Sequence, residues 1–187
     1  MRAVDTALLV VDVQQRMIAV QPEGARIVWN CRRLLDGAAA LGVQAAATEQ
    51  YPEKLGGTAS PLAERLGAVP AKLAFSCGEC GGLFAEWRAA GIERVLLCGI
   101  ETHVCVQQTA LDLLAAGYRV YIAADAVGAR HAVDHEVALR RMESSGAVIT
   151  TTEAALFEWC ERAGTPAFRQ ISELVKESPP AGPTSRV

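Results

Sequence analysis

The chain has 187 residues, of which 51% are hydrophobic, 5% aromatic and 21% charged, with a formal net charge of -3. This length and apolar content suit one domain with a full hydrophobic core and exclude a disordered or fibrous protein. The mild charge, with no block of lysine or arginine, argues against nucleic acid or an anionic membrane as a partner. No secretory segment or membrane-spanning apolar run is visible, so we expect a cytoplasmic protein.

Apolar runs alternate with stretches of helical spacing along the whole chain. The run Ala7–Val13 is continuous apart from Asp12, which is typical of a strand buried on both faces. Residues 24–41 carry an apolar stripe at helical spacing, and Gly42 predicts the end of that helix. The further expected elements are a strand at 43–48, a polar loop at 49–60, a helix at 61–66, a strand at 68–75, a helix at 82–90, a strand at 94–98, a helix carrying Cys105, a strand at 118–124, a helix at 133–144, a strand at 147–151, and helices at 153–162 and 167–177.

Strands that alternate with helices predict a three-layer α/β/α fold, with a parallel sheet covered on both faces. We expect one domain over residues 1–177 and a disordered, proline-rich tail over 178–187. In such sheets, ligands bind beyond the carboxyl ends of the strands. Three chemically useful residues fall at expected strand ends, namely Asp12, Lys72 and Cys105.

Cys105 follows a short apolar run that ends at Gly99, and helical spacing begins directly after it. We therefore expect this cysteine in the first turn of a helix, where free N–H groups and the helix dipole favour an anion. A thiol in such a place is expected to have a lowered pKa and to be a ready nucleophile. For Cys105 considered alone, a buried and inert cysteine is an equally good interpretation.

Together, the three residues form a chemically coherent set. Asp12, flanked by valines, would be partly desolvated and suited to carrying a proton. The Lys72 ammonium would keep the carboxylate ionised and favour a thiolate at Cys105. The sulfur could then attack an acyl carbon, while Asp12 protonates the leaving group and later activates water. The alternatives for the single residues are a turn residue for Asp12 and a solvated charge for Lys72.

Three segments resemble the isochorismatase-like cysteine hydrolases: Leu8–Gln14, Lys72 with Phe75 and Ser76, and Gly99–Val106. The resemblance extends over residues 5–160, and Thr48–Pro52 is similar to the branch called isochorismatase domain-containing proteins. It implies a Rossmann-like fold with a six-stranded parallel sheet and a triad formed by Asp12, Lys72 and Cys105.

The resemblance also implies a cis peptide bond between Ile100 and Glu101, which would aim the Glu101 N–H, together with that of Cys105, at an oxyanion. Related enzymes form oligomers, so a dimer or larger assembly is implied. The ligand expected is a small molecule. The residues expected to line its pocket are Gln14, Glu49, Gln50, Tyr51, Phe75, Thr102 and His103.

Two departures from the family pattern narrow the reaction. Nicotinamidases of this superfamily bind a metal through histidines after the second strand, and residues 49–55 contain none, so we expect no metal and no other cofactor. Enzymes that cleave the vinyl ether of isochorismate lack the nucleophilic cysteine, so Cys105 argues against that reaction.

The sequence therefore predicts a metal-independent hydrolase that cleaves a small-molecule amide-type bond. Two alternatives stay open: a catalytically silent binding module of the same fold, and a thiol redox protein that uses the pair Cys77 and Cys80. A nucleotide-binding role is weaker, because no glycine-rich loop follows the first strand. The cysteines expected in the core are Cys31, Cys98 and Cys160.

Overall fold

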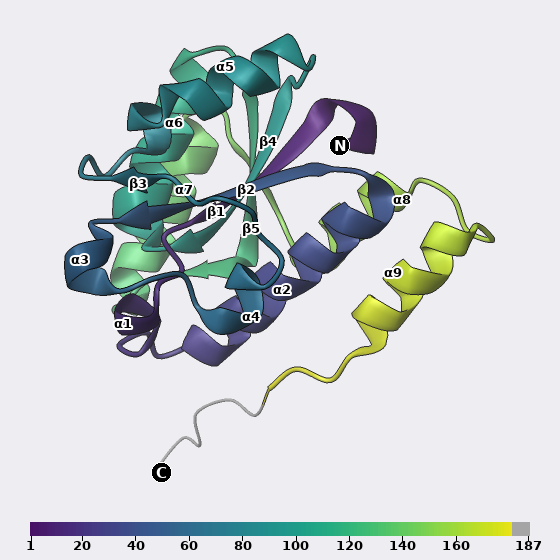
Figure 1. Cartoon of the computed structure of the whole chain (residues 1–187), viewed down its shortest axis with the longest axis horizontal. Helices are drawn as coiled ribbons and strands as arrows, with labels where there is room; N and C mark the ends of the chain where they lie inside the picture. The colour runs from purple at the N-terminus through teal and green to yellow at the C-terminus, as the bar shows by residue number, and fades with distance from the viewer. Residues whose placement is uncertain (181–187) are drawn as a thin grey trace.

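A six-stranded sheet forms the centre of the protein (Figure 1). The computed structural model describes residues 1–180. The strand order is β3-β2-β1-β4-β5-β6, and every neighbouring pair is parallel. The predicted α/β fold with a parallel sheet is confirmed. The strands are β1 (Thr6–Val11), β2 (Gln44–Gln50), β3 (Ala71–Lys72), β4 (Arg94–Ile100), β5 (Arg119–Gly128) and β6 (Val148–Thr150).

Helices cover both faces of this sheet. Side chains of α2, α8 and α9 form one apolar cluster with the sheet, and those of α5, α6 and α7 form the other. The helices are α1 (Gln15–Ile18), α2 (Gly24–Leu41), α3 (Pro52–Leu55), α4 (Ser60–Ala63), α5 (Gly81–Ala89), α6 (Gln107–Ala115), α7 (Ala132–Ser144), α8 (Thr152–Cys160) and α9 (Pro166–Lys176), with 3-10 turns η1 (Ala3–Asp5) and η2 (Cys77–Glu79) and a π-helical turn η3 (Thr102–Val106).

Strand β1 is apolar along its whole length because it is buried on both faces. Leu8 and Val10 pack into the cluster of α2, α8 and α9, whereas Leu9 and Val11 pack into the cluster of α5, α6 and α7. All four side chains are fully buried. This alternation fixes which side chains of β1 face each layer of helices.

The chain reverses its direction of winding beside β1. From β1 it passes to β2 and β3 on one side, and then returns to β4 on the other. Val11 at the end of β1 pairs with Gly99 of β4, and Gln50 at the end of β2 pairs with Lys72 of β3. The carboxyl ends of these strands therefore meet at a topological switch point, where open α/β sheets bind ligands.

Three expectations for the elements were wrong in detail. The third strand was expected over 68–75, but β3 has only two residues, because the amides and carbonyls after Lys72 bond to side chains instead. The fifth strand continues past residue 124 to Gly128, where it pairs with Ile100 beyond a register shift in β4. Cys105 lies in the π-helical turn η3, in which the Val106 N–H bonds to the Glu101 carbonyl, and α6 begins two residues later.

The expected tail falls largely outside the described residues. Residues 178–180 belong to no helix or strand, and residues 181–187 lie beyond the described range, so the disordered tail stays a prediction.

Among the helices of residues 1–180, none is long and apolar enough to cross a membrane. The cytoplasmic location stays a prediction as well.

We predict that Gly99→Ala separates β1 from β4. Gly99 has φ of 115°, and an added Cβ would lie 2.1 Å from the Val11 carbonyl oxygen. The substitution should destabilise the protein by about 3 kcal/mol or more in urea unfolding, since backbone strain and a backbone clash add. Gly117→Ala is the control, because Gly117 has φ of 88° with open space around it. Equal losses for the two variants would contradict the close approach at Gly99.

Candidate active site

Asp12 turns away from the end of β1 and is completely buried. Its φ is 51°, in the left-handed region, which aspartate tolerates better than most residues. Its backbone N–H donates to the Thr48 carbonyl at 3.2 Å, and its own carbonyl accepts from the Gln14 N–H at 2.8 Å. The carboxylate is thereby directed along the carboxyl edge of the sheet, toward β2 and β3.

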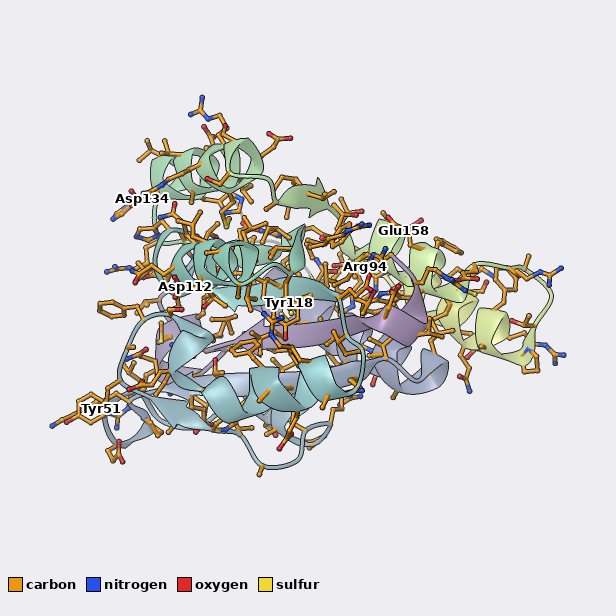
Figure 2. All side chains as sticks on the ribbon, turned by 90° about the horizontal axis from the view of Figure 1, so that it is seen from above. Tyr51, Arg94, Asp112, Tyr118, Asp134 and Glu158 are labelled. Carbon is orange, nitrogen blue, oxygen red and sulfur yellow. The ribbon has the colours of Figure 1, made fainter. Side chains whose placement is uncertain are left out.

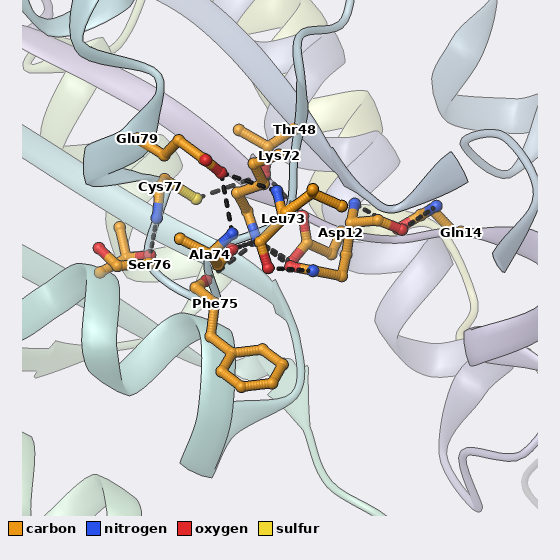
Figure 3. Close-up of polar contacts among 12 residues, drawn as sticks. Asp12, Gln14, Thr48, Lys72, Leu73, Ala74, Phe75, Ser76, Cys77 and Glu79 are labelled. Carbon is orange, nitrogen blue, oxygen red and sulfur yellow. Dashed lines mark hydrogen bonds and ion pairs between the residues drawn. The ribbon is translucent and has the colours of Figure 1, made fainter. Parts of the chain in front are cut away.

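Lys72 ends β3 and meets Asp12 in a buried ion pair (Figure 3). The distance between Lys72 Nζ and Asp12 Oδ2 is 2.7 Å, and both side chains have no exposed surface. The ammonium also donates to Gln50 Oε1 at 2.8 Å and to the Phe75 carbonyl at 2.9 Å, with the Ala74 carbonyl at 3.3 Å. Burial alone would lower the pKa of Lys72, but the charge of Asp12 and its hydrogen bond outweigh burial and raise that pKa.

The loop after β3 is held from outside by Glu79. Its Oε2 accepts the backbone N–H groups of Leu73 at 2.7 Å and Ala74 at 2.8 Å, as Figure 3 shows. These two bonds lower the pKa of Glu79. With its amides facing Glu79, the loop turns the carbonyls of Ala74 and Phe75 inward onto Lys72.

Cys105 lies beside this pair and is buried, with 2% of the residue exposed. The expected lowered thiol pKa was wrong. Burial raises the pKa of Cys105, the charge of Asp12 and a hydrogen bond to it raise it further, and the charge of Lys72 only partly opposes them. A helix terminus contributes about 0.3–1 kcal/mol at an exposed site, which is too little to offset burial next to a carboxylate. Cys105 therefore rests as a neutral thiol with a carboxylate at hand to accept its proton.

The peptide bond between Ile100 and Glu101 is cis. The Glu101 side chain turns away from the triad: its Oε1 accepts from Gln21 Nε2 at 3.1 Å and from Arg130 Nε at 2.9 Å. Burial would raise the pKa of Glu101, but these partners lower it. Whether its N–H binds an oxyanion stays a prediction.

The other expected pocket residues divide into two groups. Gln50 joins the triad through Lys72, and Tyr51 and Phe75 are exposed near it, with Tyr51 reaching the margin of the molecule in Figure 2. Gln14 and Glu49 instead hold the backbone. Gln14 bonds to the Gln50 N–H and carbonyl, and Glu49 accepts from both donors of Thr58.

Two further residues expected in the pocket belong to η3 and contact α7. Thr102 Oγ1 is 3.0 Å from His135 Nδ1, and His103 Nε2 is 3.9 Å from Asp134 Oδ2. These contacts connect the turn that carries Cys105 to α7. The two residues therefore help to hold Cys105 in place.

Sequence reasoning missed Thr48 and misjudged Cys77. The Thr48 hydroxyl donates to Asp12 Oδ1 at 2.8 Å, and its oxygen lies 3.3 Å from the sulfur of Cys77. Cys77, which the sequence offered only as half of a redox pair, is fully buried beside the triad. The available signal for Thr48 was its place at the expected end of the second strand.

Of the cysteines expected in the core, Cys31 and Cys98 are buried and Cys160 is only partly so, because it ends α8.

A cavity of about 370 Å³ opens next to Lys72. It is lined by Tyr51, Pro52, Glu53, Ala71, Lys72, Leu73 and Glu79. A larger one, of about 650 Å³, lies between α2 and α9 and includes no triad residue. Of these two cavities, only the smaller one is lined by a triad residue, Lys72. Within residues 1–180, no group of three or more His, Cys, Asp or Glu side chains could hold a metal ion.

Comparison with known proteins identifies the family. Residues 6–154 match the Isochorismatase domain, and the chain belongs to this family of isochorismatase-like hydrolases. It is 37% identical over 174 residues to isochorismatase domain-containing protein 1 of Danio rerio, an alignment that covers 90% of this chain. The chain spans 60% of the length of that relative.

Two solved structures add detail to the likeness. The MAR1 ribonuclease of Caenorhabditis elegans superposes with a TM-score of 0.89 at 32% identity, covering 100% of this chain and 97% of that one. The pyrazinamidase of Pyrococcus horikoshii in complex with zinc gives 0.67 at 30% identity, covering 79% of this chain and 99% of that one.

We predict that Lys72→Met destabilises the protein by about 3–5 kcal/mol, because it leaves the Asp12 carboxylate buried without its cation. Urea unfolding measures the loss. The double variant Asp12→Asn with Lys72→Met should lose less stability than the two single variants lose together, since no lone charge is buried in it. Additive losses would show that the two side chains do not interact.

We predict that Asp12→Asn makes Cys105 easier to ionise, because it removes the negative charge and the hydrogen bond that raise the thiol pKa. The pH dependence of alkylation by iodoacetamide, followed at Cys105 by peptide mass spectrometry, should move to lower pH than in the unaltered protein. Cys105→Ala serves as the blank. A profile that stays in place, or moves to higher pH, would contradict the proximity of Asp12 to the thiol.

Proposed function

We propose that this protein is a cysteine hydrolase that cleaves an amide-type C–N bond of a small molecule without a metal ion. The observation that carries the proposal is the buried ion pair of Asp12 and Lys72, at 2.7 Å, beside the neutral thiol of Cys105. A carboxylate next to a thiol of raised pKa is arranged to accept its proton only when the sulfur attacks.

The reaction follows from these positions. As Cys105 Sγ bonds to the carbonyl carbon, its proton passes to Asp12 and negative charge develops on the carbonyl oxygen. Asp12 then protonates the leaving nitrogen, the C–N bond breaks and a thioester remains on Cys105. Water attacks this thioester with Asp12 as the base, which releases the acid and returns the proton to sulfur. Lys72 donates to Asp12 at 2.7 Å and holds the carboxylate in place between these steps.

One of the similar proteins is in keeping with amide cleavage. The similar Pyrococcus horikoshii protein is named for cleaving an amide, pyrazinamide. A thiol redox role for Cys77 and Cys80 is disfavoured, because burial raises the pKa of Cys77 to about 11. A silent binding module would not need a nucleophile, a proton acceptor and a cation together.

RNA cleavage is the second candidate, because the similar Caenorhabditis elegans protein is named a ribonuclease. The formal net charge of -3 and the enclosure of Lys72 by Asp12 and Gln50 offer little to a polyanionic backbone. We therefore place the amide first and include RNA in the test.

We also propose that the protein is at least a dimer. The exposed apolar side chains Tyr51, Leu73 and Phe75 gather around the loops beside Lys72, where a second copy would cover them. Analytical ultracentrifugation decides this. A monomer at micromolar concentration would overturn the proposal.

We predict that amide substrates and activated esters separate the roles of Cys105 and Asp12. A library of small amides is screened with the unaltered protein, Cys105→Ala and Asp12→Asn, alongside an activated ester and RNA. Intact-mass spectrometry should find an acyl adduct on the unaltered protein and none on Cys105→Ala. Asp12→Asn should be acylated by the ester, whose leaving group needs no proton, but not by the amide. Amide or RNA cleavage that survives Cys105→Ala would overturn the proposal.

A further inference from the structure

The carboxylate of Asp12 is held at both oxygens. Lys72 Nζ lies 2.7 Å from Oδ2, and the Thr48 hydroxyl donates to Oδ1 at 2.8 Å. The backbones of the same two residues are joined as well, since the Asp12 N–H donates to the Thr48 carbonyl at 3.2 Å. Thr48 is fully buried near the end of β2, the strand between β1 and β3. A carboxylate has about four lone-pair sites, so sites remain for a proton in transit.

The Thr48 hydroxyl has in turn a fixed neighbour, the sulfur of Cys77, at 3.3 Å. A hydroxyl has one hydrogen, and here that hydrogen is directed at Asp12. The Cys77 S–H must therefore be the donor in the contact with Thr48. Burial raises the pKa of Cys77 to about 11, so the thiol retains its hydrogen at neutral pH. Cys77 is itself fixed, because its backbone N–H donates to Thr109 Oγ1 at 2.9 Å.

We propose that Thr48 is the positioning residue for Asp12, and that the thiol of Cys77 orients the Thr48 hydroxyl for this task. The chain of donors runs in one direction, from the Cys77 thiol to the Thr48 hydroxyl to the Asp12 carboxylate. With Lys72 on the other oxygen, the carboxylate is held in one orientation beside Cys105. This inference rests on the proposed function, for which Asp12 must take a proton from sulfur and hand it to nitrogen in one orientation.

The proposal gives Cys77 a use that is not redox chemistry. A buried thiol that donates one weak hydrogen bond is replaceable by a serine hydroxyl but not by a methyl group. The conservative exchange therefore separates positioning from packing at both residues. Thr48→Ser and Cys77→Ser keep the donors, whereas Thr48→Val and Cys77→Ala remove them.

The first measurement needs no substrate. The carboxylate stretching bands of Asp12 are isolated at neutral pH as the infrared difference between the protein and its Asp12→Asn variant. For each substitution, the same difference is taken between the single variant and the double variant that also carries Asp12→Asn. We expect Thr48→Val to shift these bands, Thr48→Ser to leave them nearly unchanged, and Cys77→Ala to shift them in the same direction by less. Thr6→Val is the matched control, since Thr6 is equally buried but bonds to the Arg2 carbonyl. Unshifted bands in Thr48→Val, or an equal shift in Thr6→Val, overturn the proposal.

The second measurement uses an amide on which Cys105-dependent turnover has been found. We expect Thr48→Val to lower kcat about ten-fold with little change in KM, and Thr48→Ser to restore most of it. Equal losses in the two variants overturn the proposal. Should Thr48→Val fail to fold, Cys77→Ala against Cys77→Ser supplies both comparisons.

The two ideas fail in different ways. If the Asp12 bands shift as expected but no amide is turned over, the proposed function fails and the positioning of Asp12 stands. If an amide is cleaved through Cys105 but Thr48→Val changes neither the bands nor kcat, the positioning role alone is wrong.

Discussion

The buried ion pair between Asp12 and Lys72 is the interaction on which the rest of the site depends. Removing two charges from water is costly, and an apolar pair of similar size would often be at least as stable. The fold surrounds both charges with partners: Thr48 bonds to the carboxylate, and Gln50 with two loop carbonyls bonds to the ammonium. Such extensive solvation by the protein indicates that the charges themselves are needed there.

The strand order explains how the pair is assembled. Asp12 leaves β1 and Lys72 ends β3, and β2 lies between these strands. Because side chains alternate along a strand, Thr48 and Gln50 of β2 share one face and reach the pair from the same side. On the other side of β1, the close approach of Gly99 to Val11 lets β4 deliver Cys105. Sheet topology, rather than local sequence, thus brings the nucleophile to its proton acceptor.

The resting state of the thiol follows from the same burial. In the low-polarity interior, the neighbouring carboxylate favours the neutral thiol, and the ammonium does not fully compensate. The carboxylate of the pair is therefore available as a base, and the sulfur of Cys105 becomes nucleophilic only as its proton passes to Asp12. This arrangement protects a buried cysteine from oxidation, which follows thiolate character and exposure.

The sequence was sufficient for the order of the elements and for the strand ends that carry chemistry, because hydrophobic periodicity and capping glycines are local signals. The helix over 24–41 with Gly42 at its end is an example. It was insufficient for the short β3 and for the pKa of Cys105. The length of β3 depends on side-chain bonds from Glu79 to the amides after Lys72, which no periodicity marks. The pKa of Cys105 depends on the contact of η3 with Asp12, which is distant in the sequence. Thr48 escaped notice because a threonine near a strand end has no local feature that marks it as a partner of Asp12.

The proton on Cys105 offers the most direct test of this account. Infrared spectroscopy detects the S–H stretch of a buried thiol, and the difference between the protein and Cys105→Ala isolates that of Cys105. At neutral pH we predict a clear S–H band that disappears in Cys105→Ala. Absence of this band, with a thiolate at Cys105 in the resting protein, would contradict the claim that Asp12 accepts the thiol proton only when the sulfur attacks.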